Sequence, residues 1–344
     1  MSTKNLVNEK AVILGIGEIM MRLSPTDNDV LGTSNKLNET YGGGEGNVIC
    51  SLANFNHKTK FFTKLPSNDL GKKSLKVFKE RDVDLSNVIF GEGRLGIYFL
   101  EEGVGVRNSK VIYDRAYSAF SMIKEEEINY DELLKDVGLL HISGITAALS
   151  EEHRKITLNL VKEAKSRSIL VSYDSNFRAK LWSAELCGQF LKEILNYVDI
   201  AFLGHLDITK LLNFNHDFIG IHKEDLKILY DKLQKEYPNI KVIASTKREI
   251  ESARKNSLTG YIYEKGILVE SEKYTFDILD RVGGGDAFSA GVLHGLIEGK
   301  SLKDVIEFGT VASVLKHSYK GDINYCTKED VEIFLANGVS AIGR

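Results

Sequence analysis

The sequence of 344 residues contains few cysteines and few prolines, and both shortages narrow what the protein can be. Its three cysteines, Cys50, Cys187 and Cys326, include no CxxC pair, which excludes a disulfide framework and a zinc knuckle. Their apolar or helix-compatible neighbours predict small buried side chains, and we expect a reducing, cytoplasmic compartment. The three prolines are spread along the chain, so no proline-rich linker divides it.

The chain also lacks an excess of basic charge. Its 45 Lys and Arg residues face 48 Asp and Glu residues, a formal net charge of -3, so we expect no nucleic acid as a partner. No apolar run approaches the ~18 residues that span a bilayer, and the polar first ten residues predict neither a targeting segment nor a membrane partner. Hydrophobic residues at 43% and charged residues at 27% are typical of an ordinary globular protein.

Strand-like and helix-like segments alternate over much of the chain. Such alternation predicts an α/β fold whose mostly parallel sheet is covered by helices on both faces. The helical pattern continues after residue 281. The predicted strands are 11–16, 60–65, 138–142, 169–173, 200–203 and 241–244, and the predicted helices are 47–55, 70–81, 151–166, 223–237, 285–298, 302–318 and 328–337.

One region departs from this alternation. Residues 95–101 and 109–116 form two strand-like segments joined by the turn EGVGV, with no helix between them. Together with residues 18–24 and the segment leading into Tyr41, they predict a small β-lid. The chain is therefore expected to form a single domain over 1–344, with a lid built from inserted strands near 18–41 and 94–116.

The segment DRVGGGDAFSAG at 280–291 is the strongest motif in the sequence. It places Gly283, Gly284 and Gly285 before Asp286 at the start of an apolar helix. Glycines let backbone N–H groups turn inward together, and the helix dipole adds positive potential, which makes an anion hole suited to phosphate. Asp286 is placed there to accept a proton from an attacking hydroxyl. Taken alone, the segment fits a tight turn with a capping Asp equally well.

A second glycine cluster, GGGEGN at 42–47, opens an earlier predicted helix. Gly42, Gly43 and Gly44 allow the backbone to approach a polyhydroxylated ligand closely, and Asn47 supplies both a donor and an acceptor. A helix-entry loop without a ligand would use the same residues.

Together, these two motifs resemble the signatures of the ribokinase-like, PfkB-type carbohydrate kinases. Further stretches are similar to the 2-keto-3-deoxygluconate kinase branch of that family, and the similarity runs from about residue 12 to about residue 334. The resemblance implies a Rossmann-like α/β/α sandwich, a β-lid that often serves as a homo-oligomer surface, and MgATP-dependent phosphorylation of a sugar hydroxyl. The stretches are GEIMMRLSP at 17–25, SLANF at 51–55, GIYFLEE at 96–102, VIYDRA at 111–116 and SNFRAKLW at 175–182.

The resemblance also implies roles for individual residues. Asp286 becomes the base that activates the sugar hydroxyl, and the backbone of residues 283–285 stabilises charge on the transferring phosphoryl group. Arginines would recognise the carboxylate that distinguishes a keto-deoxy sugar acid from a neutral sugar. The implied substrate-binding residues are Gly42, Gly43, Asn47, Tyr98, Tyr113, Arg115, Arg178, Asp286 and Asp322, and the implied nucleotide-binding residues are Asn176, Thr246, Arg248, Gly283 and Gly285.

Several of these assignments have ordinary structural alternatives. Arg115 and Arg178 would fit surface salt bridges, Asp322 would fit a turn after glycine, and residues 245–248 would fit a solvated loop after the strand 241–244. Many relatives carry an Asn-x-x-Glu segment that organises Mg²⁺, whereas this chain has GHLD at 204–207. Either Asp207 takes over that task or the ATP phosphates hold the metal, and a monovalent cation such as K⁺ is a second candidate ion.

The predicted function is therefore an ATP-dependent kinase that phosphorylates 2-keto-3-deoxygluconate. The alternatives are a neutral-sugar kinase of the fructokinase or ribokinase type, and a catalytically silent sugar-binding protein that regulates a partner. A nicotinamide-dependent reductase is a weaker alternative, because Met20 replaces the third glycine of the fingerprint that begins GxG at 15–17.

Overall fold

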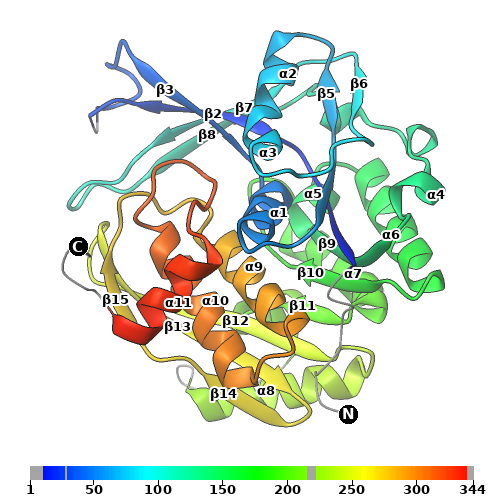
Figure 1. The fold of residues 1–344 in the computed structure, drawn as a ribbon, viewed down its shortest axis with the longest axis vertical. Helices are drawn as coiled ribbons and strands as arrows, with labels where there is room; N and C mark the ends of the chain where they lie inside the picture. The colour runs from blue at the N-terminus through cyan, green and yellow to red at the C-terminus, as the bar shows by residue number, and fades with distance from the viewer. Residues whose placement is uncertain (1–10, 28, 215–221, 339–344) are drawn as a thin grey trace.

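The computed structural model describes residues 11–27, 29–214 and 222–338 (Figure 1). Within this part, a nine-stranded sheet has the order β14-β13-β12-β11-β10-β9-β1-β4, with β15 also paired to β13. The strands from β4 to β12 in this order run parallel, and β13 pairs antiparallel with β12, β14 and β15. Their bounds are β1 (Val12–Ile16), β4 (Thr59–Phe62), β9 (Val137–Ser143), β10 (Leu170–Asp174), β11 (Ile200–Phe202), β12 (Val242–Ile250), β13 (Lys255–Glu264), β14 (Ile267–Glu270) and β15 (Tyr274–Asp277).

Helices cover both faces of this sheet, as the alternation of segments predicts. Successive strand residues point to opposite faces, and Ile13 and Leu14 accordingly belong to two different hydrophobic clusters. The same division separates Leu139 from Leu140. One cluster contains residues of α6 (Glu151–Ser166), α7 (Ala184–Ile194) and α8 (Lys223–Glu236), and the other contains residues of α1 (Gly44–Asn54), α9 (Gly284–Ile297), α10 (Leu302–Lys316) and α11 (Lys328–Asn337).

The antiparallel end of the sheet was not predicted, and the loop expected at 245–248 is wrong. These residues continue β12, because Ser245 pairs with Tyr261, Thr246 with Gly260 and Arg248 with Leu258 of β13. The apolar run ends at Ala244, but an antiparallel strand with one solvent-facing side tolerates polar residues. The hydrophobic pattern therefore ends at Ala244, whereas β12 continues to Ile250.

A separate four-stranded sheet forms from the segments predicted for the lid. Its order is β3-β2-β7-β8, with β7 and β8 antiparallel and β2 parallel to β7. Figure 1 shows it projecting from one side of the α/β body. Its action as a lid or as a dimer surface stays a prediction. The strands are β2 (Met20–Pro25), β3 (Leu37–Gly42), β7 (Gly96–Glu101) and β8 (Lys110–Asp114).

Two predicted segments are divided in the structure. The strand expected at 60–65 becomes β4 and β5 (Lys64–Pro66), and β5 pairs with β6 (Ile89–Gly91) in a two-stranded sheet. The helix expected at 70–81 becomes α2 (Asp69–Ser74) and α3 (Lys76–Lys79), because Leu75 and Phe78 bond three residues back instead of four. The short helices α4 (Tyr130–Leu133) and α5 (Gly144–Ala148) complete the described α-helices.

The remaining expectations from composition concern cysteines and membranes. Cys50, Cys187 and Cys326 are all buried and unpaired in disulfides, as predicted. Among the described helices, none is both long enough and apolar enough to cross a membrane.

Candidate active site

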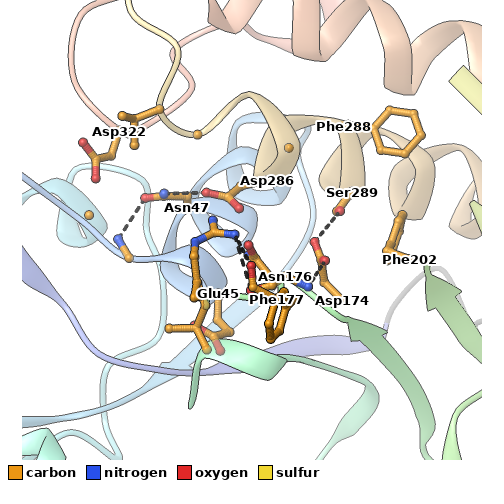
Figure 2. A pocket seen from close by; sticks show the side chains of 18 of the residues that line it. Glu45, Asn47, Asp174, Asn176, Phe177, Phe202, Asp286, Phe288, Ser289 and Asp322 are labelled. Atoms are coloured by element: carbon orange, nitrogen blue, oxygen red, sulfur yellow. Dashed lines mark hydrogen bonds between the residues drawn. The ribbon is translucent and has the colours of Figure 1, made fainter. Parts of the chain in front are cut away.

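A pocket of about 760 Å³ lies at the carboxyl ends of β10 and β11 and beside the middle of β12. The first turns of α1 and α9 form another part of its wall, and Tyr98 and Tyr113 of the small sheet close one side. Ligands of open α/β sheets bind beyond the carboxyl ends of the strands. Figure 2 shows how residues from these separate elements converge.

Close packing requires glycine at positions 283 and 284, where α9 begins. Gly283 has φ 81°, and a Cβ there would lie 2.0 Å from the backbone oxygen of Asp322. A Cβ on Gly284 would lie 2.4 Å from the His317 ring, whereas Gly285 faces open space. Because α9 begins at Gly284, the N–H groups of its first turn have no partner within the helix and carry the positive end of its dipole.

Asp286 lies in this first turn of α9 and is joined to the first turn of α1. Asn47 donates from Nδ2 to Asp286 Oδ2 at 2.7 Å, and its Oδ1 accepts from the Gly43 N–H at 3.1 Å (Figure 2). Burial raises the pKa of Asp286 to about 6, while the Asn47 hydrogen bond and the charge of Arg178 oppose that rise. A carboxylate so held is ionised at neutral pH yet readily accepts a proton.

Asp174, at the end of β10, is a second partly buried acid near Asp286. It accepts from the Asn176 N–H at 3.0 Å and from Ser289 Oγ of α9 at 3.3 Å. Burial raises its pKa to about 7, and the charges of Asp286 and Asp207 add to the rise. Asp207 accepts from Ser175 Oγ at 2.8 Å and from the Gly204 N–H at 2.7 Å, and burial raises its pKa as well.

Glu45, within the GGGEGN motif, ties α1 to the loop after β9. Its Oε1 accepts from the Ser143 N–H at 3.2 Å, from Ser143 Oγ at 2.7 Å and from Thr146 Oγ1 at 2.8 Å. Burial raises its pKa. These bonds fix the first turn of α1, and therefore Asn47, against the main sheet.

The arginines of the pocket differ in whether an acidic side chain already neutralises their charge. Arg115 forms a buried ion pair with Glu18, whose other oxygen has no hydrogen-bond partner. Arg178 donates to the backbone oxygens of Asn176 and Phe177 at 3.4 and 3.2 Å, and no salt bridge to it is found among the described residues. Arg281, inside the glycine motif, also lines the pocket.

Asp322 lies at the edge of the pocket in a cluster whose acids are all paired with one arginine. Arg22 of β2 contacts Asp322 at 3.2 Å and Asp280 at 2.6 Å. Tyr98 donates its hydroxyl to the other oxygen of Asp322 at 2.6 Å. Burial alone would lower the pKa of Arg22, but the two aspartates outweigh it and raise that pKa. The cluster fastens the small sheet to the loop before α9.

The structure brings most of the predicted site residues to one cavity. Gly284 and Arg248 are the exceptions, since neither is among the described residues lining it. Arg248 instead donates to the His317 ring at 3.1 Å, beneath Gly284, and burial with the nearby charge of Arg281 lowers its pKa to about 10. The predicted residues that line the pocket are Gly42, Gly43, Asn47, Tyr98, Tyr113, Arg115, Asn176, Arg178, Asp207, Thr246, Gly283, Gly285, Asp286 and Asp322.

Sequence reasoning missed four charged residues of the pocket, namely Glu18, Glu45, Asp174 and Arg281. Asp174 directly follows the predicted strand 169–173, so a charged residue at the carboxyl end of a buried strand was the available signal. Glu45 and Arg281 lie inside the two glycine motifs. Glu18 carries no such signal, because its pairing with Arg115 depends on tertiary contact.

The charges of the pocket are not balanced. Among its described lining residues are six carboxylic acids, Glu18, Glu45, Asp174, Asp207, Asp286 and Asp322, and three arginines, Arg115, Arg178 and Arg281. An excess of acids repels a polyphosphate unless a cation accompanies it. The arrangement therefore suits an anion that arrives with a metal ion, next to a helix N-terminus that can receive it.

Comparison with known proteins agrees with this geometry. The family model of pfkB family carbohydrate kinases matches residues 10–330. The 2-dehydro-3-deoxygalactonokinase of Haloferax volcanii is 28% identical over 97% of this chain and 99% of its own length. The 2-dehydro-3-deoxygluconokinase of Bacillus subtilis is 28% identical over 86% of each chain.

A solved structure is similar along nearly the whole chain. The 2-dehydro-3-deoxygluconokinase of Thermotoga maritima is 34% identical, superposes with a TM-score of 0.91, and matches over 95% of this chain and 100% of its own. The family match and this likeness confirm the resemblance and the ribokinase-like fold predicted from the sequence. The chain therefore belongs to the pfkB family and is a carbohydrate kinase, an enzyme that uses ATP to phosphorylate a sugar.

Proposed function

We propose that this kinase transfers the γ-phosphoryl group of ATP to a hydroxyl of 2-keto-3-deoxygluconate. The observation that carries the proposal is the position of Asp286, a partly buried carboxylate at the N-terminus of α9, held by Asn47 at the wall of the pocket. The named substrates of the Bacillus and Thermotoga relatives support the choice of sugar acid. The Haloferax relative is named for the galacto epimer, so both epimers belong in the test.

In this proposal Asp286 is the general base. The sugar hydroxyl gives its proton to the Asp286 carboxylate while its oxygen bonds to the γ-phosphorus, and the bond from that phosphorus to ADP breaks. The backbone N–H groups of Gly283, Gly284 and Gly285 face the charge that develops on the transferring group. Asn47 keeps the accepting oxygen of Asp286 in place.

The carboxylate of the sugar acid is assigned to Arg178. A charged hydrogen bond contributes roughly 1.5 to 3 kcal/mol, and Arg178 has no acidic partner within salt-bridge distance in the described chain. Arg115 is already neutralised by Glu18, so it serves the sugar as a hydrogen-bond donor more than as a charge. The other residues proposed on the sugar side are Gly42, Gly43, Asn47, Tyr98, Tyr113 and Asp322.

The nucleotide is placed on the side of the pocket formed by β10 and β12. Asn176 and Thr246 line it there, and Gly283 and Gly285 receive the phosphates. Arg248 supports this side from beneath, through His317 and Gly284. The missed residue Arg281 lies in the pocket beside the glycines and adds a positive charge for the phosphates.

The residues present fit a hard divalent cation bound chiefly by phosphates. Asp174 and Asp207 offer the carboxylate oxygens that Mg²⁺ prefers, and a cation beside them would relieve the repulsion that raises the pKa of Asp174. No group of three ligand residues lies close together at the pocket in the described chain, so the ATP phosphates and water complete the shell. Mg²⁺ supplies neutralisation of charge on the transferring group.

A neutral-sugar kinase is the second candidate, and the Arg115–Glu18 ion pair favours it, because that pair brings no net charge to the pocket. Membership of a carbohydrate-kinase family removes the case for a nicotinamide-dependent reductase and for a silent binder. A K⁺ requirement, assembly through the small sheet and a cytoplasmic location stay predictions.

An assay of ADP release across a substrate panel tests the proposal. The panel holds both epimers of the keto-deoxy sugar acid, fructose and ribose, each at equal concentration with MgATP. We expect kcat/KM to be highest for 2-keto-3-deoxygluconate, by at least about tenfold over either neutral sugar. Faster turnover of fructose or ribose would replace the sugar acid with the neutral-sugar alternative.

A further inference from the structure

A second cluster of ligand side chains lies away from the pocket, at the far ends of α1 and α9. His57, His294 and Glu298 each offer a ligand atom, and these atoms lie within 4.8 Å of one another. His57 Nε2 and His294 Nδ1 face each other at 2.8 Å. Across residues 11–27, 29–214 and 222–338, no other group of three such residues meets this spacing. The catalytic proposal uses none of them.

The backbone sets all three side chains in place. Asn56 adopts φ 67° after the end of α1, and the His57 N–H then donates to the Leu52 oxygen at 3.1 Å, which fixes the turn that carries His57. His294 and Glu298 are four residues apart at the end of α9, so they share one face of that helix. The two histidines therefore join helices that are far apart in the sequence.

We propose that His57, His294 and Glu298 form a binding site for a late first-row divalent metal ion, with Zn²⁺ as the natural occupant. Two imidazoles and one carboxylate are ligands that such ions accept, and tetrahedral Zn²⁺ keeps bound nitrogens about 3.3 Å apart. The two ring nitrogens need to separate only slightly to admit the ion. Mg²⁺ prefers oxygen ligands throughout, so this site is distinct from that of MgATP.

Neighbouring groups affect how tightly these side chains would bind a metal ion. The His294 ring packs against Phe55 and Phe308, with ring centroids 5.5 and 4.5 Å away, and its Nε2 has no hydrogen-bond partner. Apart from the contact with His57, packing orients this ring, without the outer acceptor that usually strengthens a metal-bound histidine. Lys328 lies 3.3 Å from Glu298 and competes with the ion for that carboxylate.

The position of this metal site, away from the catalytic pocket, indicates that the ion aligns α1 and α9 and takes no part in phosphoryl transfer. His294 follows Asp286 by eight residues on α9, which is about 12 Å along the helix axis. At their other ends, α9 and α1 carry Asp286 and Asn47, joined by the 2.7 Å hydrogen bond. An ion that clamps the far ends stabilises the same pair of helices and does not depend on which sugar the enzyme phosphorylates.

Cobalt provides the direct test, because Co²⁺ replaces Zn²⁺ and reports its ligands by visible absorption. The tag-free full chain is stripped with a chelator, desalted, and titrated with Co²⁺ and then with Zn²⁺ in the absence of ATP. We expect a ligand-field band of low-coordinate Co²⁺ that Zn²⁺ bleaches. We also expect Tm to rise by about 4 °C when Zn²⁺ reaches about 100 times its dissociation constant.

Four variants locate the ion. His57→Gln and Glu298→Gln, both at less buried positions than His294, should weaken Co²⁺ binding by about 100-fold and about tenfold, while Lys328→Gln should tighten it. Asp207→Asn removes a carboxylate of the catalytic pocket and should leave the band unchanged. Absence of the band in the wild type, or a band and Tm shift that persist in folded His57→Gln and Glu298→Gln, would overturn the site.

Discussion

Two charged clusters lie on either side of Gly283, and they are built on opposite principles. In the matched cluster each acid is paired with Arg22, which contacts Asp280, Asp322 and Glu102 at 2.6, 3.2 and 3.1 Å. In the acidic cluster, burial raises the pKa of Asp286 to about 6 and that of Asp174 to about 7, and the charge of Asp286 adds to the rise at Asp174. Similar residues thus have different tasks according to whether an opposite charge is bonded to them.

The matched cluster organises backbone. Asp280 accepts from the Val282 N–H at 3.0 Å and from the Gly321 N–H at 2.9 Å, while Arg22 brings in the small sheet. The acidic cluster leaves carboxylates facing a cavity where a proton or a cation can be received. We infer that ion-paired acids position the glycine loop and that acids without an ion-pair partner among the described residues carry out the transfer.

The largest effect is expected for Asp286→Asn, which removes the base and keeps its shape. Because an amide does not accept the hydroxyl proton, kcat should fall by about 10²- to 10⁴-fold. Binding of ATP and of sugar, measured by calorimetry, should stay within a few-fold of the wild type. A kcat reduced by less than tenfold would show that Asp286 is not the general base.

Arg22→Met tests the matched cluster. It leaves two buried carboxylates without their partner, so the free energy of unfolding should fall by about 3–5 kcal/mol in denaturant titration. The combined variant Arg22→Met/Asp280→Asn/Asp322→Asn removes the stranded charges and should regain part of that loss. A loss below about 1 kcal/mol for the single variant would show that the ion pairs of Arg22 do not stabilise the fold.

Arg178→Gln separates sugar acids from neutral sugars. Loss of the charged hydrogen bond should raise KM for the keto-deoxy acid by about 10- to 100-fold and leave a neutral sugar's KM nearly unchanged. The same change at Arg115 is the control for a charge that Glu18 already neutralises, and its effect should be smaller. Equal effects on both kinds of sugar would show that Arg178 has a structural role and does not recognise the carboxylate.

Asp174→Asn gives a smaller effect on stability that depends on pH. The pKa of Asp174 is raised in the folded state, so the folded state holds its proton more tightly than the unfolded state, and stability from this group falls as pH rises toward 7. The variant should therefore melt a few degrees higher than the wild type at pH 8 and about equally at pH 4. A lower Tm at pH 8 would contradict an unmatched charge at this position.

Much of the fold followed from hydrophobic pattern, and the failures have local causes. Buried parallel strands such as Val12–Ile16 are continuous apolar runs, and helices such as Lys328–Asn337 are periodic, so both were predicted closely. The antiparallel strands β13 to β15 were missed because half-exposed strands mix polar and apolar residues. The site was predicted where glycine motifs and family resemblance mark it, as at Asp286.

Tertiary pairing explains what the sequence did not reveal about the site. The pairing of Arg22 with Asp280 and Asp322 joins residues about 260 and 300 positions apart, and the pairing of Glu18 with Arg115 joins the segment between β1 and β2 to the segment after β8. Arg248 was assigned to the nucleotide because it was expected in a loop, whereas its place in β12 directs it to His317. Such contacts depend on strand order, which hydrophobic periodicity does not encode.

The pH dependence of kcat/KM tests most directly whether Asp286, which has no ion-pair partner in the part of the chain that the structure describes, is the base. The reaction needs the ionised carboxylate, and its pKa is raised from an ordinary 3.8 to about 6, so activity should fall as pH decreases through about 6. Asn47→Ala removes a bond that lowers this pKa, so its acid limb should move to higher pH, while Asp174→Asn should keep an acid limb. Activity that stays constant down to pH 4.5 in the wild type would contradict the account.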